Sequence, residues 1–269
     1  MSVNWSGELD PHFARAWSEY VEGLAERRIL PDRIRLLVAI GQCTSIGEPE
    51  AVLRLVEHAL EGGVSVAEIH EVLLQACIYA GRPVVDRTLE AFAEFVTRAG
   101  LKDELMRARL PAEGGNADRS LERERQAWPA HHHYRRVDAM LQVYDWRGIS
   151  TSIMTQPKHA QALLETLDVL DPAYASLWLN FIYRDMYSRK VLDDRTRTMV
   201  MIGNCLALGS HDQTENHMRN AMALGATPEE VQEVIFQSLQ YLGTVRSQWA
   251  IPIFQKIIVE ADTHPNHAS

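Results

Sequence analysis

The chain has 269 residues, of which 46% are hydrophobic, and this is enough for a packed core. Its 27 basic and 36 acidic residues give a net charge of -9, which disfavours nucleic acid as a partner because binding a phosphate backbone requires a dense basic surface. The sequence shows neither a signal peptide nor the roughly 20-residue apolar run of a membrane span, so we expect a cytoplasmic protein.

The first predicted helix begins at Pro11. Asp10 precedes it, and a capping aspartate followed by proline at the first helical position is typical of a helix start. The apolar residues that follow recur on one helical face, and we expect Trp17 and its later counterpart Trp178 to anchor the core. The next helix is predicted from Asp32, with Asp32 as its N-cap.

Two further helices are predicted before the middle of the chain. Residues 52–60 carry an apolar stripe at helical spacing, which ends near Gly62. Ser65 and Glu68 have the spacing of a capping box that opens another helix, and the same spacing recurs at Thr227. Since no segment alternates apolar and polar residues between hairpin turns, we expect no strands.

The middle of the chain is polar. We interpret residues 113–136, which include the run His131–His133, as a linker; a flap that offers a His or Arg to an anionic substrate is the alternative. Three adjacent histidines cannot all face one metal ion on a regular helix or strand, and no zinc-site spacing accompanies them, so no metal site is predicted. We expect a turn over Trp146–Ser150 and a helix over Ala160–Leu167.

Three blocks of sequence occur twice in the same order. The pairs are Leu9–Trp17 with Leu170–Trp178, Asp32–Gly47 with Asp194–Gly209, and Glu68–Gly81 with Glu230–Gly243. Over residues 31–89 the second copy follows at a constant offset of 162, so Asp194 is a predicted cap like its counterpart. We therefore predict an all-α fold of two tandem helical repeats, at 1–112 and 166–269, with 113–165 as linker and intervening segment.

The repeat resembles the carboxymuconolactone decarboxylase family, whose wider superfamily includes the alkyl hydroperoxidase D proteins. The resemblance rests on an Asp-Arg-x-Arg helix start, a Gly that ends this helix and a His-x-Arg helix. A Gly-Val/Ala-Ser/Thr turn, a Glu-Ile/Val-x-Glu-Val helix and Tyr-Ala-Gly-x-Pro follow, and the match covers about 90 residues of each half. It implies an all-helical fold, trimers or hexameric rings, and sites near subunit contacts.

The two copies keep different parts of this pattern. His217 and Arg219 match His-x-Arg in the second copy, where the first copy has Leu55 and Glu57. The first copy keeps Tyr-Ala-Gly-x-Pro at Tyr79–Pro83, of which the second copy keeps only the Tyr and the Gly. We therefore expect one class of site, carried mainly by the second half, and a packed or supporting region at the equivalent place in the first.

His217 is the predicted catalytic residue, because imidazole exchanges protons near neutral pH. A buried, hydrogen-bonded structural histidine is the alternative, and the resemblance favours the functional reading. The residues predicted to bind substrate are Arg219, His211, Glu215, Gln237, Tyr241, Tyr79 and Arg82. Arg219 points to another side of the helix, and Glu215 is a candidate to orient the imidazole. We expect Gln237 and Tyr241 to line the pocket with His217, closed by the first repeat or by a neighbouring chain.

Two departures from the family pattern bear on the reaction. The peroxidase branch has Cys-x-x-Cys ahead of its histidine; Ser210 and Gln213 stand there, so thiol peroxidase activity is disfavoured. The Glu that often follows the Arg of the early helix is replaced by Leu36 and Thr198. We expect the three cysteines to be small, buried and reduced: Cys43, Cys77 and Cys205.

These observations predict a cofactor-independent enzyme that performs acid–base chemistry, including decarboxylation, on a small carboxylated or lactone-like substrate. The alternative is a non-catalytic binding or assembly protein that retained the fold. We expect no nucleic-acid or membrane partner, and a homo-oligomer, a trimer whose six repeats imitate a hexameric ring. Arginines that recur in both copies are predicted to form structural salt bridges: Arg33, Arg35, Arg195 and Arg197.

Overall fold

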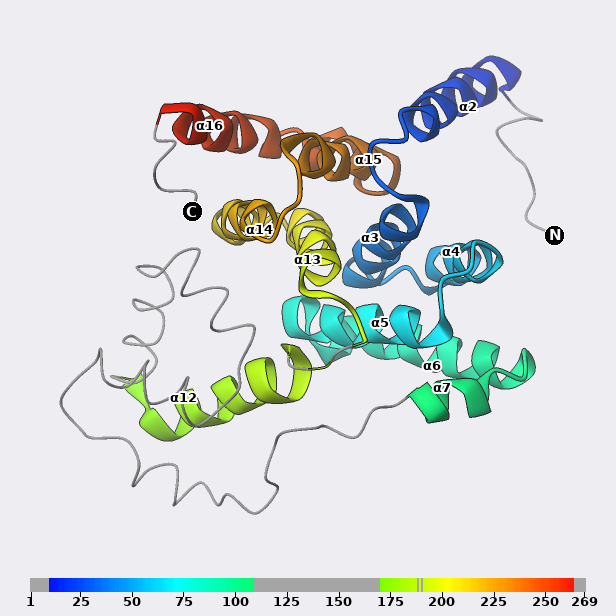
Figure 1. Cartoon of the computed structure of the whole chain (residues 1–269). Coiled ribbons are helices and arrows are strands. Elements are labelled where there is room, and N and C mark those ends of the chain that lie inside the picture. The colour runs from blue at the N-terminus through cyan, green and yellow to red at the C-terminus, as the bar shows by residue number, and fades with distance from the viewer. Residues whose placement is uncertain (1–9, 109–169, 188, 190, 264–269) are drawn as a thin grey trace.

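The computed structural model of the chain describes residues 10–108, 170–187, 189 and 191–263, whose secondary structure is entirely helical (Figure 1). The first repeat contains α2 (Pro11–Glu26), α3 (Asp32–Ser45), α4 (Pro49–Glu61), α5 (Val66–Ala80), α6 (Arg82–Arg98) and α7 (Lys102–Ala108). The second contains α12 (Pro172–Leu179), the π-helix η1 (Asn180–Tyr187), α13 (Asp194–Leu208), α14 (His211–Ala223), α15 (Pro228–Ser247) and α16 (Ala250–Thr263). The predicted all-α fold of two tandem repeats is confirmed.

The central helices of the two halves correspond in the order of the repeated sequence blocks. Helices α3, α4 and α5 each begin 162 residues before α13, α14 and α15. Gly81 and Gly243 also correspond: both have a positive φ, of 77° and 74°, which glycine adopts without steric cost. Gly81 ends α5, and Gly243 introduces a kink into α15. Three predicted features lie outside the described residues: Trp146–Ser150, Ala160–Leu167 and His131–His133.

Most of the predicted helix starts are confirmed. The Asp10 carboxylate accepts a hydrogen bond from the Phe13 N–H at 2.9 Å, and Pro11 opens α2. Ser65 and Glu68 form a reciprocal capping box at α5, and Thr227 forms the same arrangement at α15. Each box satisfies two N–H groups that the first helical turn leaves without a partner.

The predicted caps of the two central helices are wrong by one position. Asp32 and Asp194 are the first helical residues rather than the caps. Asp193 caps α13 by accepting a hydrogen bond from the Thr196 N–H at 2.8 Å. Pro31 stands at the equivalent position before α3, and because its side chain carries no oxygen it offers no such bond.

Helices α3 and α13 cross at the centre of the described part, with α15 on one side and α5 on the other (Figure 1). Gly41 and Gly203, which correspond at the offset of 162, lie at this crossing. A Cβ atom on Gly41 would lie 2.9 Å from Val200 Cγ1, and one on Gly203 would lie 2.9 Å from Val38 Cγ1. The absence of these two Cβ atoms therefore permits the close approach of the central helices.

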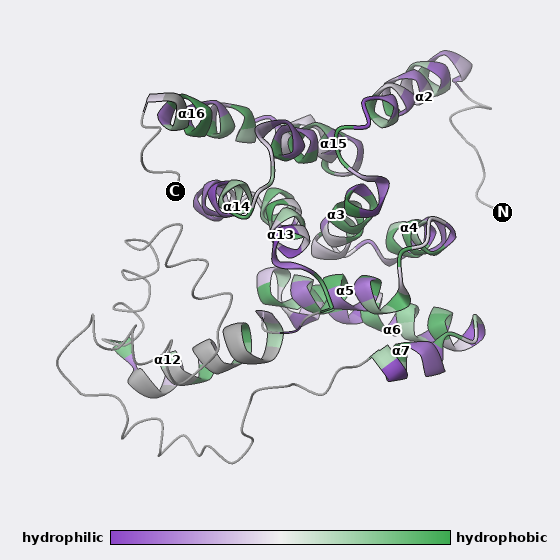
Figure 2. Cartoon of the chain, in the orientation of Figure 1, coloured by the Kyte–Doolittle hydropathy of each residue, from purple (hydrophilic) through white to green (hydrophobic). Residues whose placement is uncertain are grey.

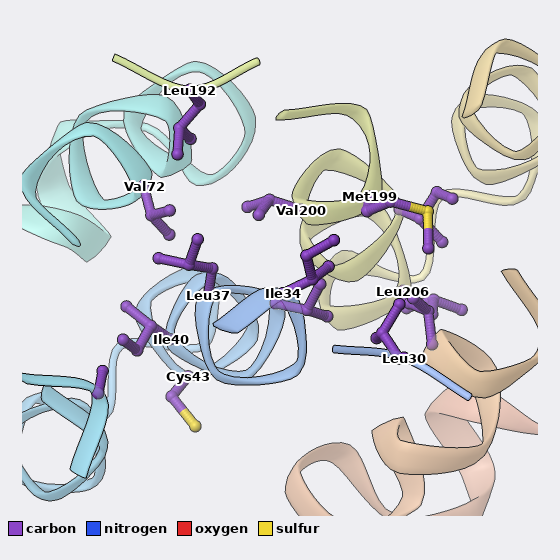
Figure 3. Close-up of a cluster of buried hydrophobic side chains, with 14 of the residues drawn as sticks. Leu30, Ile34, Leu37, Ile40, Cys43, Val72, Leu192, Met199, Val200 and Leu206 are labelled. Carbon is purple, nitrogen blue, oxygen red and sulfur yellow. The ribbon is translucent and has the colours of Figure 1, made fainter. Parts of the chain in front are cut away.

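The hydrophobic core is continuous across the two repeats. In Figure 3, Leu37 of α3 points toward Val72 of α5 and Val200 of α13. Hydrophobic and hydrophilic residues are interspersed along the outer helices (Figure 2), as expected where one helical face is buried. The tryptophans do not anchor this core as predicted. Trp17 is 41% exposed and Trp178 is half-buried, since α2 and α12 lie at the periphery.

Candidate active site

Two equivalent ion-pair clusters join the repeats around the centre. In one, Glu71 of the first repeat accepts hydrogen bonds from Arg189 at 2.7 Å and from Arg197 at 2.8 Å. In the other, Glu233 of the second repeat binds two arginines of the first, through Arg27 at 2.8 Å and Arg35 at 3.4 Å. Both carboxylates are fully buried. Each repeat thus provides one buried glutamate, and the other repeat provides the arginines that bind it.

The other two predicted arginines each bind a glutamate of their own repeat, and Arg33 also lies 4.0 Å from Asp193 of the second repeat. Arg33 binds Glu68, and Arg195 binds Glu230 at the equivalent place. The prediction that the recurring arginines form structural salt bridges is therefore confirmed.

His217 lies in α14 and is 8% exposed. Its Nε2 atom is 3.0 Å from the hydroxyl of Tyr79, and the two rings meet edge to face with their centroids 5.7 Å apart. The Tyr79 hydroxyl is also 3.0 Å from the hydroxyl of Tyr187. These contacts form a hydrogen-bonded chain from the imidazole through two phenols, along which a proton can move in either direction.

Three elements position this chain. Tyr79 lies in the last turn of α5, next to the backbone turn at Gly81, and thus belongs to the first repeat. Tyr187 is the last residue of the π-helix η1. π-Helical turns widen the helix locally and are found frequently at functional sites. The tyrosine that contacts His217 therefore comes from the opposite repeat.

The surroundings of Tyr187 keep its hydroxyl protonated. Burial raises the pKa of Tyr187 to about 12, and the hydrogen bond with Tyr79 and the charge of Arg197 limit this rise. Arg197 itself is buried and donates to Gln75, Glu71 and the backbone oxygen of Arg189. A phenol that remains protonated over the whole physiological pH range is a hydrogen-bond donor, and it passes its proton to a neighbouring base only as it takes up another one.

Arg219 and Glu215 form a separate cluster. Arg219 donates to Glu215 and to Glu260, each at 2.6 Å, and Lys256 donates to Glu215 at 3.1 Å. Burial raises the pKa of Glu215, but the hydrogen bonds from Arg219 and Lys256 outweigh this effect and lower it overall. The suggestion that Glu215 orients the imidazole is therefore not supported: its cationic neighbours engage it, and a phenol contacts His217 instead. The separate role expected for Arg219 agrees with its position.

The remaining predicted residues lie in different places. His211 stacks on Trp249, with ring centroids 4.0 Å apart. The amide of Gln237 donates to the backbone oxygen of Arg35 at 3.5 Å. Arg82, whose side chain is 78% exposed, pairs with Asp86. Of the predicted substrate-binding residues, Tyr79 is the one that the described contacts bring to His217.

The expected packed region in the first repeat is instead a cavity of about 970 Å³. It is lined by Leu55, the counterpart of His217, and by Tyr241, the counterpart of Tyr79. Tyr241 therefore lines a different place from His217, contrary to the expectation that they share one pocket. The reason is the exchange between the repeats: α15 completes the region around α4, whereas α5 completes the region around α14.

Sequence reasoning missed Tyr187 and the arginine–glutamate clusters. The correspondence at offset 162 relates Arg197 to Arg35 and Glu71 to Glu233, which indicates structural equivalence but not which glutamate each arginine binds. At the two positions of the missing family Glu, Leu36 lines the cavity and the Thr198 hydroxyl donates to its own helix.

The thiols are poor nucleophiles in this fold. Cys43 and Cys205 are buried as predicted, whereas Cys77 is only partly buried, and all three are free. Burial raises the pKa of Cys43 to about 12 and also raises those of Cys77 and Cys205. The described residues include no group of three or more His, Cys, Asp or Glu side chains placed to hold a metal ion. Within the same part of the chain, no helix is long and apolar enough to cross a membrane.

Comparison with known proteins supports the resemblance seen in the sequence. The model of the carboxymuconolactone decarboxylase family matches twice, over residues 11–94 and 172–256. The chain is similar to 4-carboxymuconolactone decarboxylase of Acinetobacter baylyi, with 28% identity over 108 residues, which are 40% of this chain and 81% of that protein. It is also similar to an uncharacterized 15.0 kDa protein, in the nqo9-nqo10 intergenic region of Paracoccus denitrificans, with 30% identity over 101 residues, 37% of this chain and 75% of that one.

Each of these relatives aligns over about the length of one repeat, and the two family matches together cover more than half of the chain. The matched ranges include every residue of the hydrogen-bonded chain and of the ion-pair clusters described above. The chain therefore belongs to the carboxymuconolactone decarboxylase family, with two copies of the family domain in tandem.

Proposed function

We propose that the protein is a cofactor-independent enzyme that catalyses decarboxylation of a small carboxylated lactone or a similar conjugated acid, with His217 as its acid–base group. The observation that carries this proposal is the hydrogen-bonded chain of His217, Tyr79 and Tyr187. It provides a group that exchanges protons near neutral pH and a phenol that restores its proton.

The reaction needs no redox partner. Loss of CO2 breaks the bond between the carboxylate and the neighbouring carbon and leaves the electron pair on that carbon, where conjugation with a carbonyl group spreads it as an enolate. A proton delivered to the carbon completes the change, so that carboxylate and proton become a C–H bond and CO2. His217 Nε2 is the proposed donor, and Tyr79 and Tyr187 relay a proton from solvent back to it, each phenol gaining one proton as it gives up another.

The positive charge beside the hydrogen-bonded chain of His217, Tyr79 and Tyr187 favours an anionic substrate. Arg189 and Arg197 share the single carboxylate of Glu71, so the cluster carries an excess positive charge next to Tyr187. Such a charge attracts a carboxylate and stabilises negative charge that develops during the reaction. The three free thiols fit a reducing cytoplasm, where we place the protein.

The first substrate to test is 4-carboxymuconolactone, because a relative of the chain is named for its decarboxylation. His217→Ala should lower turnover about a hundredfold or more, the usual scale for a positioned proton-transfer residue. Tyr79→Phe should lower turnover to a smaller extent and change the pH–rate profile, because it removes the hydroxyl that joins His217 to Tyr187. Release of CO2 is the measurement.

Two matched controls separate this chemistry from effects on folding. His70→Ala removes another imidazole, one that stacks on Phe92, and Tyr174→Phe removes another phenol, one that is exposed on α12. Both variants should retain the parent rate. Full turnover by a folded His217→Ala variant would contradict the assignment, whereas absence of turnover from the parent chain with a panel of conjugated acids would favour a binding protein.

A further inference from the structure

The cavity in the first repeat lies where the His217 site would be repeated. The offset of 162 relates Tyr79 to Tyr241 and His217 to Leu55. Arg27 and Arg189, which bind equivalent glutamates, extend this offset ahead of residue 31, where it relates Tyr187 to Ala25. Tyr241, Leu55 and Ala25 all line the cavity. An aliphatic side chain and a methyl group thus replace an imidazole and a phenol, and the space of two rings contributes to a cavity of about 970 Å³. This volume is at the upper end of the range for small-molecule sites.

The same replacements remove the hydrogen-bond partners of polar groups in the cavity, although the equivalent groups of the His217 site keep theirs. Within the described part of the chain, the Tyr241 hydroxyl makes no hydrogen bond, whereas Tyr79 binds both His217 and Tyr187. Burial raises the pKa of Tyr241 to about 12, so its hydroxyl remains a hydrogen-bond donor at neutral pH. A hydrogen bond from this unpaired hydroxyl to an acceptor that enters the cavity would therefore stabilise the complex.

Arg35 differs from its counterpart in the same way. Arg197 donates to Gln75, Glu71 and a backbone oxygen, while the hydrogen bonds of the Arg35 guanidinium within the described residues are limited to Glu233 at 3.4 Å. Its Nε and Nη2 atoms are buried and lack hydrogen-bond partners there. Arg27 shares Glu233 with Arg35, and the exposed Asp32 carboxylate lies 4.0 Å from Arg35 Nε, so Glu233 is the buried carboxylate of this cluster.

The other residues that line the cavity define its interior and its mouth. Leu24, Leu36 and Ile46 give it an apolar wall. Its remaining charged residues, Asp32, Glu48 and Arg54, together with His58, are exposed, so solvent and salt screen them. Arg35, with only 14% of its side chain exposed, is the charged residue that lies inside. The cavity therefore combines an apolar wall with a buried cation and a phenol.

We infer that this cavity is a second binding site, for a small carboxylate with a ring-sized apolar body, and that it binds this ligand without converting it. The carboxylate lies near the Arg35 cation and accepts a hydrogen bond from Tyr241, and the ring occupies the space next to Leu55 and Ala25. Leucine cannot transfer a proton, so the group that acts at the equivalent place in the second repeat is missing here. The inference is independent of the reaction proposed at His217.

The test is isothermal titration calorimetry of the full chain with benzoate, compared with benzamide, which has the same shape and no charge. Benzoate should bind, and the affinity of benzamide should be lower by roughly tenfold or more. Leu55→Trp and Ala25→Phe refill the cavity from α4 and from the end of α2, and each should weaken benzoate binding by at least about tenfold. Ala25 is exposed, so its replacement provides a folded variant if Leu55→Trp does not fold.

His70→Ala is the matched control: His70 stacks on Phe92 and does not line the cavity, so this variant should bind benzoate as the parent chain does. Binding that survives both refilling variants, or that is lost in His217→Ala and retained in Ala25→Phe, would overturn the inference, because the ligand would then occupy another place. Absence of benzoate binding to the parent chain at millimolar concentration would overturn it as well. A failed His217 assay with intact benzoate binding would reject only the proposed function.

Discussion

Individual residues of the site differ from their usual chemistry because they are buried. Burial raises the pKa values of Tyr187, Tyr241 and Cys43, each to about 12, so these groups remain neutral where the unfolded chain would ionise. The two phenols are therefore donors rather than phenolates in the folded protein. The same shifts determine how the stability of the fold depends on alkaline pH.

We predict that the free energy of unfolding falls as the pH rises from about 9 to about 12. In this window the unfolded chain has lost protons that the folded chain retains on Tyr187, Tyr241 and Cys43, so the unfolded state binds fewer protons and is favoured by each rise in pH. Stability from these groups is fully present below their unfolded pKa values. Urea denaturation at about pH 8 and about pH 11 measures the loss.

A Tyr187→Phe variant should show a shallower decline, because one of the shifted groups is gone. An equal decline in parent and variant would mean that Tyr187 ionises alike in both states. Tyr174→Phe, at an exposed tyrosine, supplies the comparison for loss of a phenol without burial.

At the level of helices, the contact between α3 and α13 depends on two glycines. A Cβ atom on Gly41 would lie 2.6 Å from Asn204 Oδ1 and 2.9 Å from Val200 Cγ1, and both neighbours are fully buried. Neither side chain can move into open space, so the two helices would have to separate. The fit between these helices is therefore fixed by the lack of a side chain at the crossing.

We predict that Gly41→Ala lowers the free energy of unfolding by about 1–3 kcal/mol, the typical cost of overpacking a core. Gly23→Ala is the matched control: no atom lies within 4 Å of its added Cβ, and alanine in the interior of α2 should stabilise by roughly 0.5–1 kcal/mol. Thermal or urea unfolding of both variants decides the matter. An unchanged midpoint for Gly41→Ala would show that the crossing relaxes freely.

Helix starts show where local patterns suffice and where they do not. The capping boxes at Ser65 and Thr227 follow from residues three apart, and both are present. The predicted cap of α13 was one residue too late. Asp193 and Asp194 are both acceptable caps, and only the backbone conformation at the turn distinguishes them. Trp17 had the spacing of a core residue, but spacing identifies an apolar face and not what covers it.

For the whole molecule, the constant offset of 162 was sufficient to predict two equivalent repeats and the helical fold. It was not sufficient to predict the site. Equivalence along the sequence relates Tyr79 to Tyr241, but it is silent on whether each tyrosine serves its own repeat or the other one. That choice depends on how α3 and α13 cross, which is a long-range property of packing.

The exposed faces of α2, α12 and η1 lead to a prediction for the assembly. Phe13 and Trp17 are exposed on α2, and the later helices expose Tyr174, Leu177 and Phe181. Equivalent apolar surfaces at the start of each repeat suit a closed ring of like subunits. We propose a trimer in which six repeats form the ring.

Light scattering at micromolar concentration should give three times the chain mass of 30.5 kDa. Replacing Phe13 and Tyr174 together by Ser should reduce this mass without loss of helical content, because both side chains are already exposed within one chain. A mass of one chain for the parent protein would refute the proposal.

The reciprocal pairing of Glu71 with Arg197 and of Glu233 with Arg35 has a consequence for the history of the gene. Deletion of either repeat would leave a buried charge of the other repeat without its ion-pair partner. It would also remove residues from both the His217 site and the cavity at Leu55. A substitution in α5 can therefore change the His217 site of the second repeat, and a substitution in α15 can change the cavity of the first repeat. The duplicates are thus free to specialise, as Leu55 and His217 have done, yet neither can be discarded.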